Sequence, residues 1–177
     1  MRIQILTAGL CILLAGCSAV PTGSGGGGAV TGASTAASGE TIPKDAVAVY
    51  SWEAQGSMVF RCTYDEKGFY WAFLRPEGKL TGSGGRVQAV LGPDFSVTAR
   101  DGSSLTARIV GQGPLESARD LRTAVFRTQA SKSGMLRGVR WYARRQPNGG
   151  MPLATCTASQ RGHLLRVPFR ARYVFYR

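Results

Sequence analysis

Hydrophobic and polar positions alternate along most of the chain after Ala46, in short runs separated by Gly, Pro, Asp and Asn. Phe69, Trp71 and Phe73 occupy every second position directly after the turn-like segment 65–68. A period of two places these side chains on one face of an extended strand, because successive side chains of a strand point to opposite sides. The pattern therefore predicts a β-strand after a tight turn, and it recurs elsewhere in the chain.

The last segment of the chain has the clearest alternation. The odd positions between 169 and 175 are Phe, Ala, Tyr and Phe, whereas Arg170 and Arg172 fall on the opposite face. Asp101-Gly102 separates two further alternating runs, which is typical of a β-hairpin. No window keeps a helical period of about 3.6 residues. We therefore predict an all-β fold, a single antiparallel β-sandwich or barrel-like domain of roughly eight or more short strands.

The N-terminal pattern is different. Arg2 supplies a positive charge, and residues 5–14 form a mostly apolar run of about ten residues, roughly half the length of a bilayer-spanning helix. Such a run is typical of a secretory signal peptide. The sequence LAGC at 14–17 resembles the lipobox of bacterial lipoproteins, in which the cysteine thiol is acylated and the chain is cut just before it. We predict a lipoprotein signal peptide at 1–16 and lipidation at Cys17; the alternative is an ordinary signal peptide with an incidental cysteine.

Residues 18–41 contain no aromatic side chain and one charge, Glu40. Such a segment cannot bury enough apolar surface to offset the entropy cost of ordering it. We predict a lipidated, disordered Gly/Ser/Ala/Thr tether at 17–41 and a β-rich globular domain at 42–177. The lipid on Cys17 makes the membrane an expected partner, since several acyl chains together anchor a protein stably. A serine follows this cysteine where inner-membrane retention favours aspartate, so we expect a lipid-anchored protein of the bacterial envelope, at the outer membrane rather than the inner one.

Cys62 and Cys156 are the two cysteines of the predicted globular domain. In an oxidising envelope, an isolated pair of cysteines predicts a disulfide. A metal-binding pair and a redox dithiol are the alternatives, but the chain has one histidine and no Cys-x-x-Cys motif. We expect no metal site and no cofactor.

The formal net charge of +12 is concentrated near the C-terminus. Residues 41–118 contain eight Lys or Arg and eight Asp or Glu, whereas residues 119–177 contain thirteen Lys or Arg and one acid, Asp120. Strong basicity usually suggests a nucleic-acid partner, but a signal peptide carries a protein away from the genome. We expect an anionic glycan, lipopolysaccharide or an envelope protein instead. The alternative is that the arginines only form a solvated surface.

Two strands predicted near the C-terminus carry the arginines that would bind such a partner. Guanidinium groups suit phosphate and carboxylate groups, which they bind through two parallel hydrogen bonds. If the two strands are neighbours, their arginines line one face together with Tyr142 or Tyr176. The candidate anion-binding residues are Arg140, Arg144, Arg145, Arg166, Arg170 and Arg172.

No motif in the sequence assigns a catalytic residue. His163 is the single histidine, and no serine lies in a Gly-x-Ser-x-Gly motif. A glycosidase needs two carboxylates about 5–9.5 Å apart, and Glu53, Glu77, Asp94 and Glu116 qualify only by default.

In order along the chain, five segments read MVFRCTY, WAFLRPEGKL, LGPDFSVTARDGS, NGGMPLATC and VPFRARYVFY. This ordered set resembles the secreted bacterial and fungal family known as domain of unknown function 3455, with a similarity that covers residues 46–177. The resemblance implies one extracytoplasmic β-rich domain with Cys62 and Cys156 at the family's paired positions, and it assigns no catalytic residue. Members of the family commonly have a histidine shortly before the Gly-Pro. This chain reads GGRVQAVLGPDF there and has no histidine, so any role that the family's histidine has is absent from this protein.

These observations favour a bacterial envelope lipoprotein with a non-catalytic binding or structural module. Its basic C-terminal face would contact an anionic glycan, lipid or protein. The alternative is a secreted hydrolase of unrecognised type that acts on envelope or extracellular polymers. Carboxylates converging in a concave pocket would favour the hydrolase, and an exposed arginine-rich face over a closed core would favour the binding module. Trp52, Trp71 and Trp141 are candidates for a sugar-stacking platform, foremost Trp52 or Trp141, although large rings are commoner in a β core.

Overall fold

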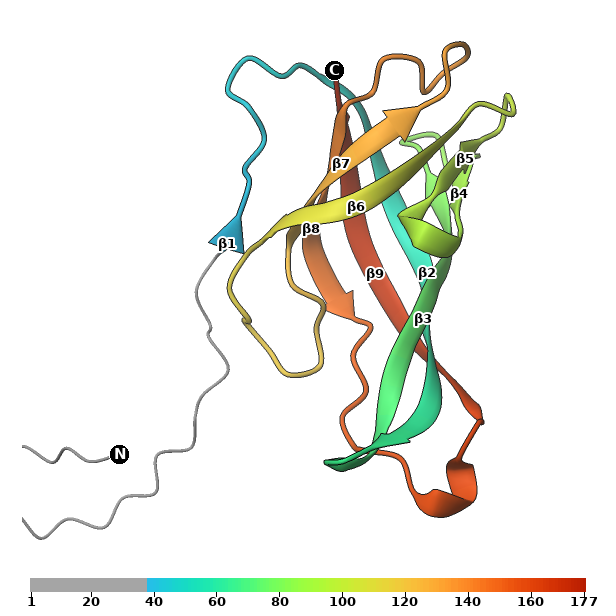
Figure 1. Cartoon of the computed structure of the whole chain (residues 1–177). Helices are drawn as coiled ribbons and strands as arrows, with labels where there is room; N and C mark the ends of the chain where they lie inside the picture. Colours follow the sequence, from blue (N-terminus) through green and yellow to red (C-terminus); the bar gives the residue numbers. More distant parts are fainter. Residues whose placement is uncertain (1–37) are drawn as a thin grey trace, which may run out of the picture. The chain divides into compact units, whose positions relative to one another are not determined.

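The structure, a computed structural model, describes residues 38–177 (Figure 1). The predicted signal peptide at 1–16, the lipidation site Cys17 and most of the predicted tether at 17–41 lie outside the described residues. Within the described part of the chain, no helix is long and apolar enough to cross a membrane.

The regular secondary structure of the described residues consists of nine β-strands and two short 3-10 helices, without an α-helix. The strands are β1 (Ser38–Gly39), β2 (Ala48–Asp65), β3 (Gly68–Thr81), β4 (Val87–Leu91), β5 (Val97–Ala99), β6 (Ser104–Gln112), β7 (Ala124–Ala130), β8 (Trp141–Gly149) and β9 (Leu164–Tyr176). The 3-10 helices span Pro93–Phe95 and Ala158–Gln160.

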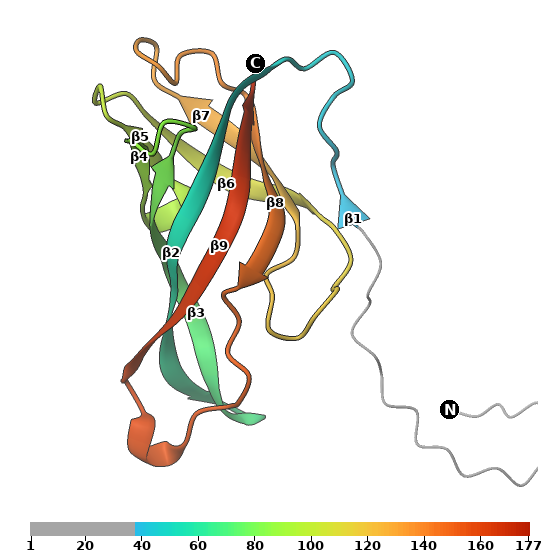
Figure 2. The same cartoon turned by 180° about the vertical axis from the view of Figure 1, so that it is seen from behind.

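Eight of these strands close into a ring. They are hydrogen-bonded in the order β6-β5-β4-β3-β2-β9-β8-β7, and β7 pairs back with β6. Every pairing is antiparallel, as Figures 1 and 2 show from opposite sides. The predicted all-β, barrel-like fold is therefore confirmed. A ring of strands leaves few free edges, which protects the sheet from pairing with other chains.

Large aromatic side chains fill the interior of the ring. Phe126 stacks on Tyr142 with ring centroids 4.3 Å apart, and Phe175 contacts both Tyr142 and Trp52. The alternation predicted for the last strand is confirmed, because the odd positions of β9 from Phe169 to Phe175 are buried and the arginines between them are exposed. Burial of these rings is the main source of stability in such a core.

The hairpin of β2 and β3 extends beyond the ring as a two-stranded arm. The pairing of β2 with β9 ends at Arg61, whereas its pairing with β3 continues to Asp65, where the predicted turn closes the hairpin. A disulfide joins Cys62 of this arm to Cys156, which precedes the last 3-10 helix, so the predicted bond is confirmed. The arm points downward in Figure 1.

The strand β1 is paired with the C-terminal end of β6, through Gly39 and Gly111. The backbone amide of Glu40 also donates a hydrogen bond to the carbonyl of Val110, at 2.8 Å. Residues 38–40, which belong to the last part of the segment predicted as a tether, therefore contact β6.

Candidate anion-binding face

The outward side chains of four adjacent strands, β8, β9, β2 and β3, form one continuous basic surface. Odd positions of β2 point outward, because even positions such as Trp52 and Met58 are buried in the core. We define the basic face as the outward side chains of these strands level with residues 53–61 of β2. Its cations are Arg61, Arg75, Lys79, Arg145, Arg166, Arg170 and Arg172, and its carboxylates are Glu53 and Glu77. Seven cations against two carboxylates leave a net charge of +5.

The register places like charges directly opposite one another at one edge of this face. Arg145 of β8 is the cross-strand partner of Arg172 on β9, and both side chains are exposed. Arg172 is in turn paired with Glu53 of β2, with its Nε 2.7 Å from a carboxylate oxygen. Like charges directly opposite one another destabilise a sheet. The single carboxylate of Glu53 neutralises one of the two positive charges, so this edge of the face keeps a net positive charge.

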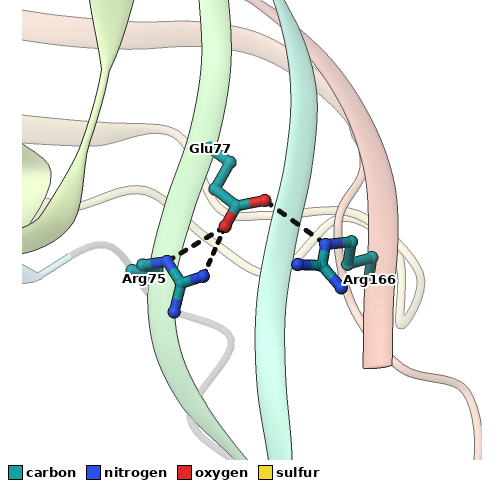
Figure 3. Close-up of polar contacts among 3 residues, drawn as sticks. All are labelled: Arg75, Glu77 and Arg166. Carbon is teal, nitrogen blue, oxygen red and sulfur yellow. Dashed lines mark hydrogen bonds and ion pairs between the residues drawn. The ribbon is translucent and has the colours of Figure 1, made fainter. Parts of the chain in front are cut away.

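At the other end of the face, Glu77 lies between two arginines from different strands (Figure 3). Arg75 donates two hydrogen bonds to one carboxylate oxygen, at 2.6 and 3.0 Å, and the Nε of Arg166 approaches the other oxygen at 3.4 Å. The hydrogen bonds from Arg75 are the main reason that the pKa of Glu77 is lowered, and Arg166 adds to the effect. Val59, the β2 residue between these two arginines in the register, is fully buried.

Arg170 occupies the centre of the face and has no carboxylate partner among residues 38–177. Its cross-strand neighbours are Gln55 on β2 and Asn148 on β8. These three residues line a shallow pocket of about 260 Å³, and Lys79 follows Gln55 in the same row. A guanidinium group flanked by two amides can bind a carboxylate or phosphate together with nearby hydroxyl groups.

Four of the six predicted arginines, Arg145, Arg166, Arg170 and Arg172, therefore share the basic face, and the other two do not. Arg144 is only 4% exposed and points into the barrel, as does Tyr142 two positions earlier. The physical reason is the two-residue period of a strand, which sends neighbours such as Arg144 and Arg145 to opposite sides. Arg140 is exposed but precedes β8, where its amide donates to Tyr176, so it lies at the far end of β8 from Arg145.

Sequence reasoning missed the contribution of β3. Arg75, Glu77 and Lys79 alternate in the stretch RPEGKL, and this alternation was the available signal. The proline and glycine in the same stretch obscured it, because both residues are usually depleted in strand interiors.

The remaining candidate side chains lie apart from this face or are buried. Trp52 is 5% exposed in the core, and Trp141 is half-buried with an indole N–H that has no partner in the described part of the chain. Trp71 instead lines an apolar pocket of about 290 Å³ inside the arm, with Phe60 and Leu153. Burial therefore keeps Trp52 from stacking on a sugar, and the guanidinium carbon of Arg127 lies 6.0 Å from the centre of the Trp141 ring.

The candidate carboxylates are distributed over four parts of the structure. Glu53 and Glu77 lie four register positions apart on the outer face, and each is paired with arginine. Asp94 belongs to the first 3-10 helix and Glu116 to the loop between β6 and β7. His163 is exposed just before β9. Among residues 38–177, no three His, Cys, Asp or Glu side chains are grouped as a metal site.

Neither the curated proteins nor the solved structures contain a match to this chain. One family model, described as Protein of unknown function (DUF3455), matches residues 85–177. This segment runs from just before β4 to the C-terminus and includes Cys156 and the arginines of β8 and β9. The match starts later than the similarity at 46–177 expected from the motifs, yet it spans more than half of the chain, and the chain belongs to this family of unknown function, domain of unknown function 3455.

Proposed function

We propose that this chain is a lipid-anchored protein of the bacterial envelope whose barrel binds an anionic glycan or lipopolysaccharide through the basic face. The observation that carries the proposal is the excess of seven cations over two carboxylates on one continuous outer surface. Arg170, at its centre, is flanked by amides rather than by acids. An exposed arginine-rich face over a filled core supports a binding module rather than a hydrolase.

The chemistry of the face suits a polymer with repeated negative groups. Arginine forks bind carboxylates and phosphates through paired hydrogen bonds, and Gln55 and Asn148 can bond sugar hydroxyls. Neighbouring strands lie about 4.8 Å apart, so the face offers cations at intervals across β8, β9, β2 and β3. An acidic glycan lying across the strands would contact several of them at once.

The test replaces three cations of the face, Lys79→Gln, Arg170→Gln and Arg172→Gln, in the full-length protein. Titration against lipopolysaccharide and against a polyuronate should show at least about tenfold weaker binding at low salt, which is about 1.4 kcal/mol. Raising the salt concentration should narrow the difference, because ions screen exposed charges beyond about 8–10 Å. Folding should be nearly unchanged, since exposed substitutions usually alter stability by less than about 0.5 kcal/mol each.

The matched control removes three exposed cations elsewhere, Arg86→Gln, Arg100→Gln and Arg137→Gln. It lowers the net charge by the same amount and should weaken binding far less. Equal losses in the two triple variants would mean that only the total charge matters. Absence of salt-dependent binding by the natural protein would leave the arginines as a solvated surface and overturn the proposal.

A further inference from the structure

A third pocket, of about 260 Å³, lies where β1 meets the ends of β6, β7 and β8. Its lining includes the N-terminal segment 39–41 and, from β8, Arg144 and Arg145. Thr123 and Gln112 add polar side chains. The lining therefore includes hydroxyl and amide groups and two consecutive arginines, one buried and one exposed.

Glycine allows the N-terminal segment to line this pocket. A Cβ atom on Gly111 would lie within 1.9 Å of the carbonyl oxygen of Glu40, so a side chain there would push the segment away. The Glu40 carboxylate reaches across to β7 and pairs with Arg127, at 2.9 Å. The acid in the pocket wall is thus already paired with an arginine outside the lining.

The two lining arginines have no carboxylate partner within residues 38–177. Arg144 is buried; its Nε donates to the carbonyl of Arg122, at 3.0 Å, and its guanidinium carbon lies 5.7 Å from the centre of the Phe126 ring. Arg145 is exposed and forms no ion pair in this part of the chain. A guanidinium does not deprotonate in proteins, and a buried charge is costly unless an opposite charge or hydrogen bonds compensate it.

The hydroxyl of Tyr173 lies next to the Arg144 guanidinium. Tyr173 is the cross-strand partner of Arg144, and its hydroxyl is fully buried. Burial raises the pKa of Tyr173, and the nearby Arg144 charge partly offsets this rise. The hydroxyl of Tyr173 therefore stays protonated at neutral pH and leaves the Arg144 charge without a counter-charge.

We propose that this pocket binds a small oxyanion, the carboxylate or phosphate group of a small molecule or sugar, with the buried Arg144 supplying the opposite charge from inside the barrel and the exposed Arg145 adding to it from the outer side of β8. The pocket is smaller than most sites for drug-sized ligands, which occupy about 300–1,000 Å³, so its ligand is about the size of one sugar unit. The site is distinct from the basic face, which it meets only at Arg145.

The test uses the full-length protein with inorganic phosphate and glucuronate as probes. NMR titration should shift the backbone amide signals of Gly111 and Gly113, which line the pocket. Saturation by phosphate alone would identify a phosphate site, saturation by glucuronate alone a carboxylate site, and both a general oxyanion site. Unchanged signals with both probes would overturn the proposal.

Arg144→Gln and Arg145→Gln should each weaken probe binding by about tenfold. Arg144→Gln can fail to fold, because the residue is buried, and Arg145→Gln at the exposed neighbouring position then decides the outcome. The control is the triple variant at Lys79, Arg170 and Arg172, which should bind the small probes normally although it loses the polymer. Equal probe affinity in Arg145→Gln and the natural protein would contradict the assignment, whatever the polymer binding shows.

Discussion

At the scale of single residues, Glu77 has a special position on the basic face. It is the one carboxylate in residues 38–177 that is paired with two arginines, Arg75 and Arg166. Without this charge, the two guanidinium groups would repel each other across β2. Exposed ion pairs usually contribute little, but this carboxylate lies between two cations that would otherwise face each other.

The lowered pKa of Glu77 predicts a pH dependence for its contribution to stability. The folded-state pKa lies below the ordinary value of 4.5, so the contribution is fully present above that value and is lost as the pH falls through the folded-state pKa. In thermal unfolding, Glu77→Gln should lower the melting temperature at pH 7, and its difference from the natural protein should shrink below about pH 4.5.

The control for this prediction is Glu66→Gln at the tip of the arm, where an exposed carboxylate without an ion pair in the described chain is removed. A melting difference for Glu77→Gln that stays constant between neutral and strongly acidic pH would contradict the stabilising role of the ionised carboxylate.

Individual orientations could be predicted only where the strand was regular. The two-residue period placed Arg170 and Arg172 correctly, because β9 alternates without interruption through this stretch. The same period, applied to β8, would have placed Arg144 and Arg145 on opposite faces of the sheet rather than on one face. Pairing of β8 with β9 also shifts between Arg145 and Asn148, next to Gln146 with its positive φ. No local signal in the sequence marks that irregularity.

At the scale of elements, the arm of β2 and β3 depends on its link to the loop before β9. Beyond Arg61 the arm has only two strands, and an isolated two-stranded hairpin is marginally stable in water. The disulfide from Cys62 to Cys156 spans 94 residues of sequence. Aromatic side chains such as Phe60 and Trp71 on the inner side of the arm line a pocket with Met151 and Leu153.

We therefore predict that the double variant Cys62→Ala, Cys156→Ala loosens the arm before the ring. Loss of a native disulfide typically costs about 2–5 kcal/mol, so the melting temperature should fall. Hydrogen exchange should accelerate at Thr63 and Tyr70 in the arm, whereas Tyr142 and Tyr173 in the ring should keep their protection. Equally protected arm amides in both proteins would show that packing and the backbone hydrogen bonds from Cys62 to His163 and from Gly162 to Cys62 hold the arm without the disulfide.

The turns of these elements were predictable, and the strand lengths were not. Segment 65–68 and Asp101-Gly102 both form hairpin turns as the sequence indicates. The sequence predicted short strands, but β2 has 18 residues and continues through Gly56. A Cβ on Gly56 would lie 2.0 Å from the carbonyl oxygen of Glu77, so glycine here permits a close approach of two strands rather than ending one.

At the scale of the whole molecule, the all-β class could be predicted but the closure of the ring could not. Alternation is a local property, whereas closure depends on β6 pairing with both β5 and β7, which lie at the two ends of the strand order. The candidate pocket between β1 and the ends of β6, β7 and β8 could not be predicted from the sequence for the same reason. It requires the N-terminal segment to lie beside strands more than seventy residues away in the sequence.

The predicted lipid anchor belongs to this scale as well, because it would determine which polyanions the barrel meets. If residues 18–37 are the flexible tether that their composition predicts, about twenty residues give a mean reach of roughly 25 Å. The barrel would then remain close to the headgroups of the membrane that holds Cys17. Lipopolysaccharide and glycans at that surface are the partners that the basic face would encounter most often.

Replacement of the anchoring thiol, Cys17→Ser, tests this arrangement in cells. The variant should lose fatty-acid labelling and move from the membrane pellet to the soluble envelope fraction, because the apolar run at 5–14 is too short to hold the protein in a bilayer. Cys11→Ser is the matched control, since it removes a thiol from the same apolar run and should leave labelling and pelleting intact. Unchanged labelling and pelleting of Cys17→Ser would contradict the anchor. A released variant that still binds lipopolysaccharide with the affinity of the natural protein would show that the lipid localises the barrel and that the basic face does the binding.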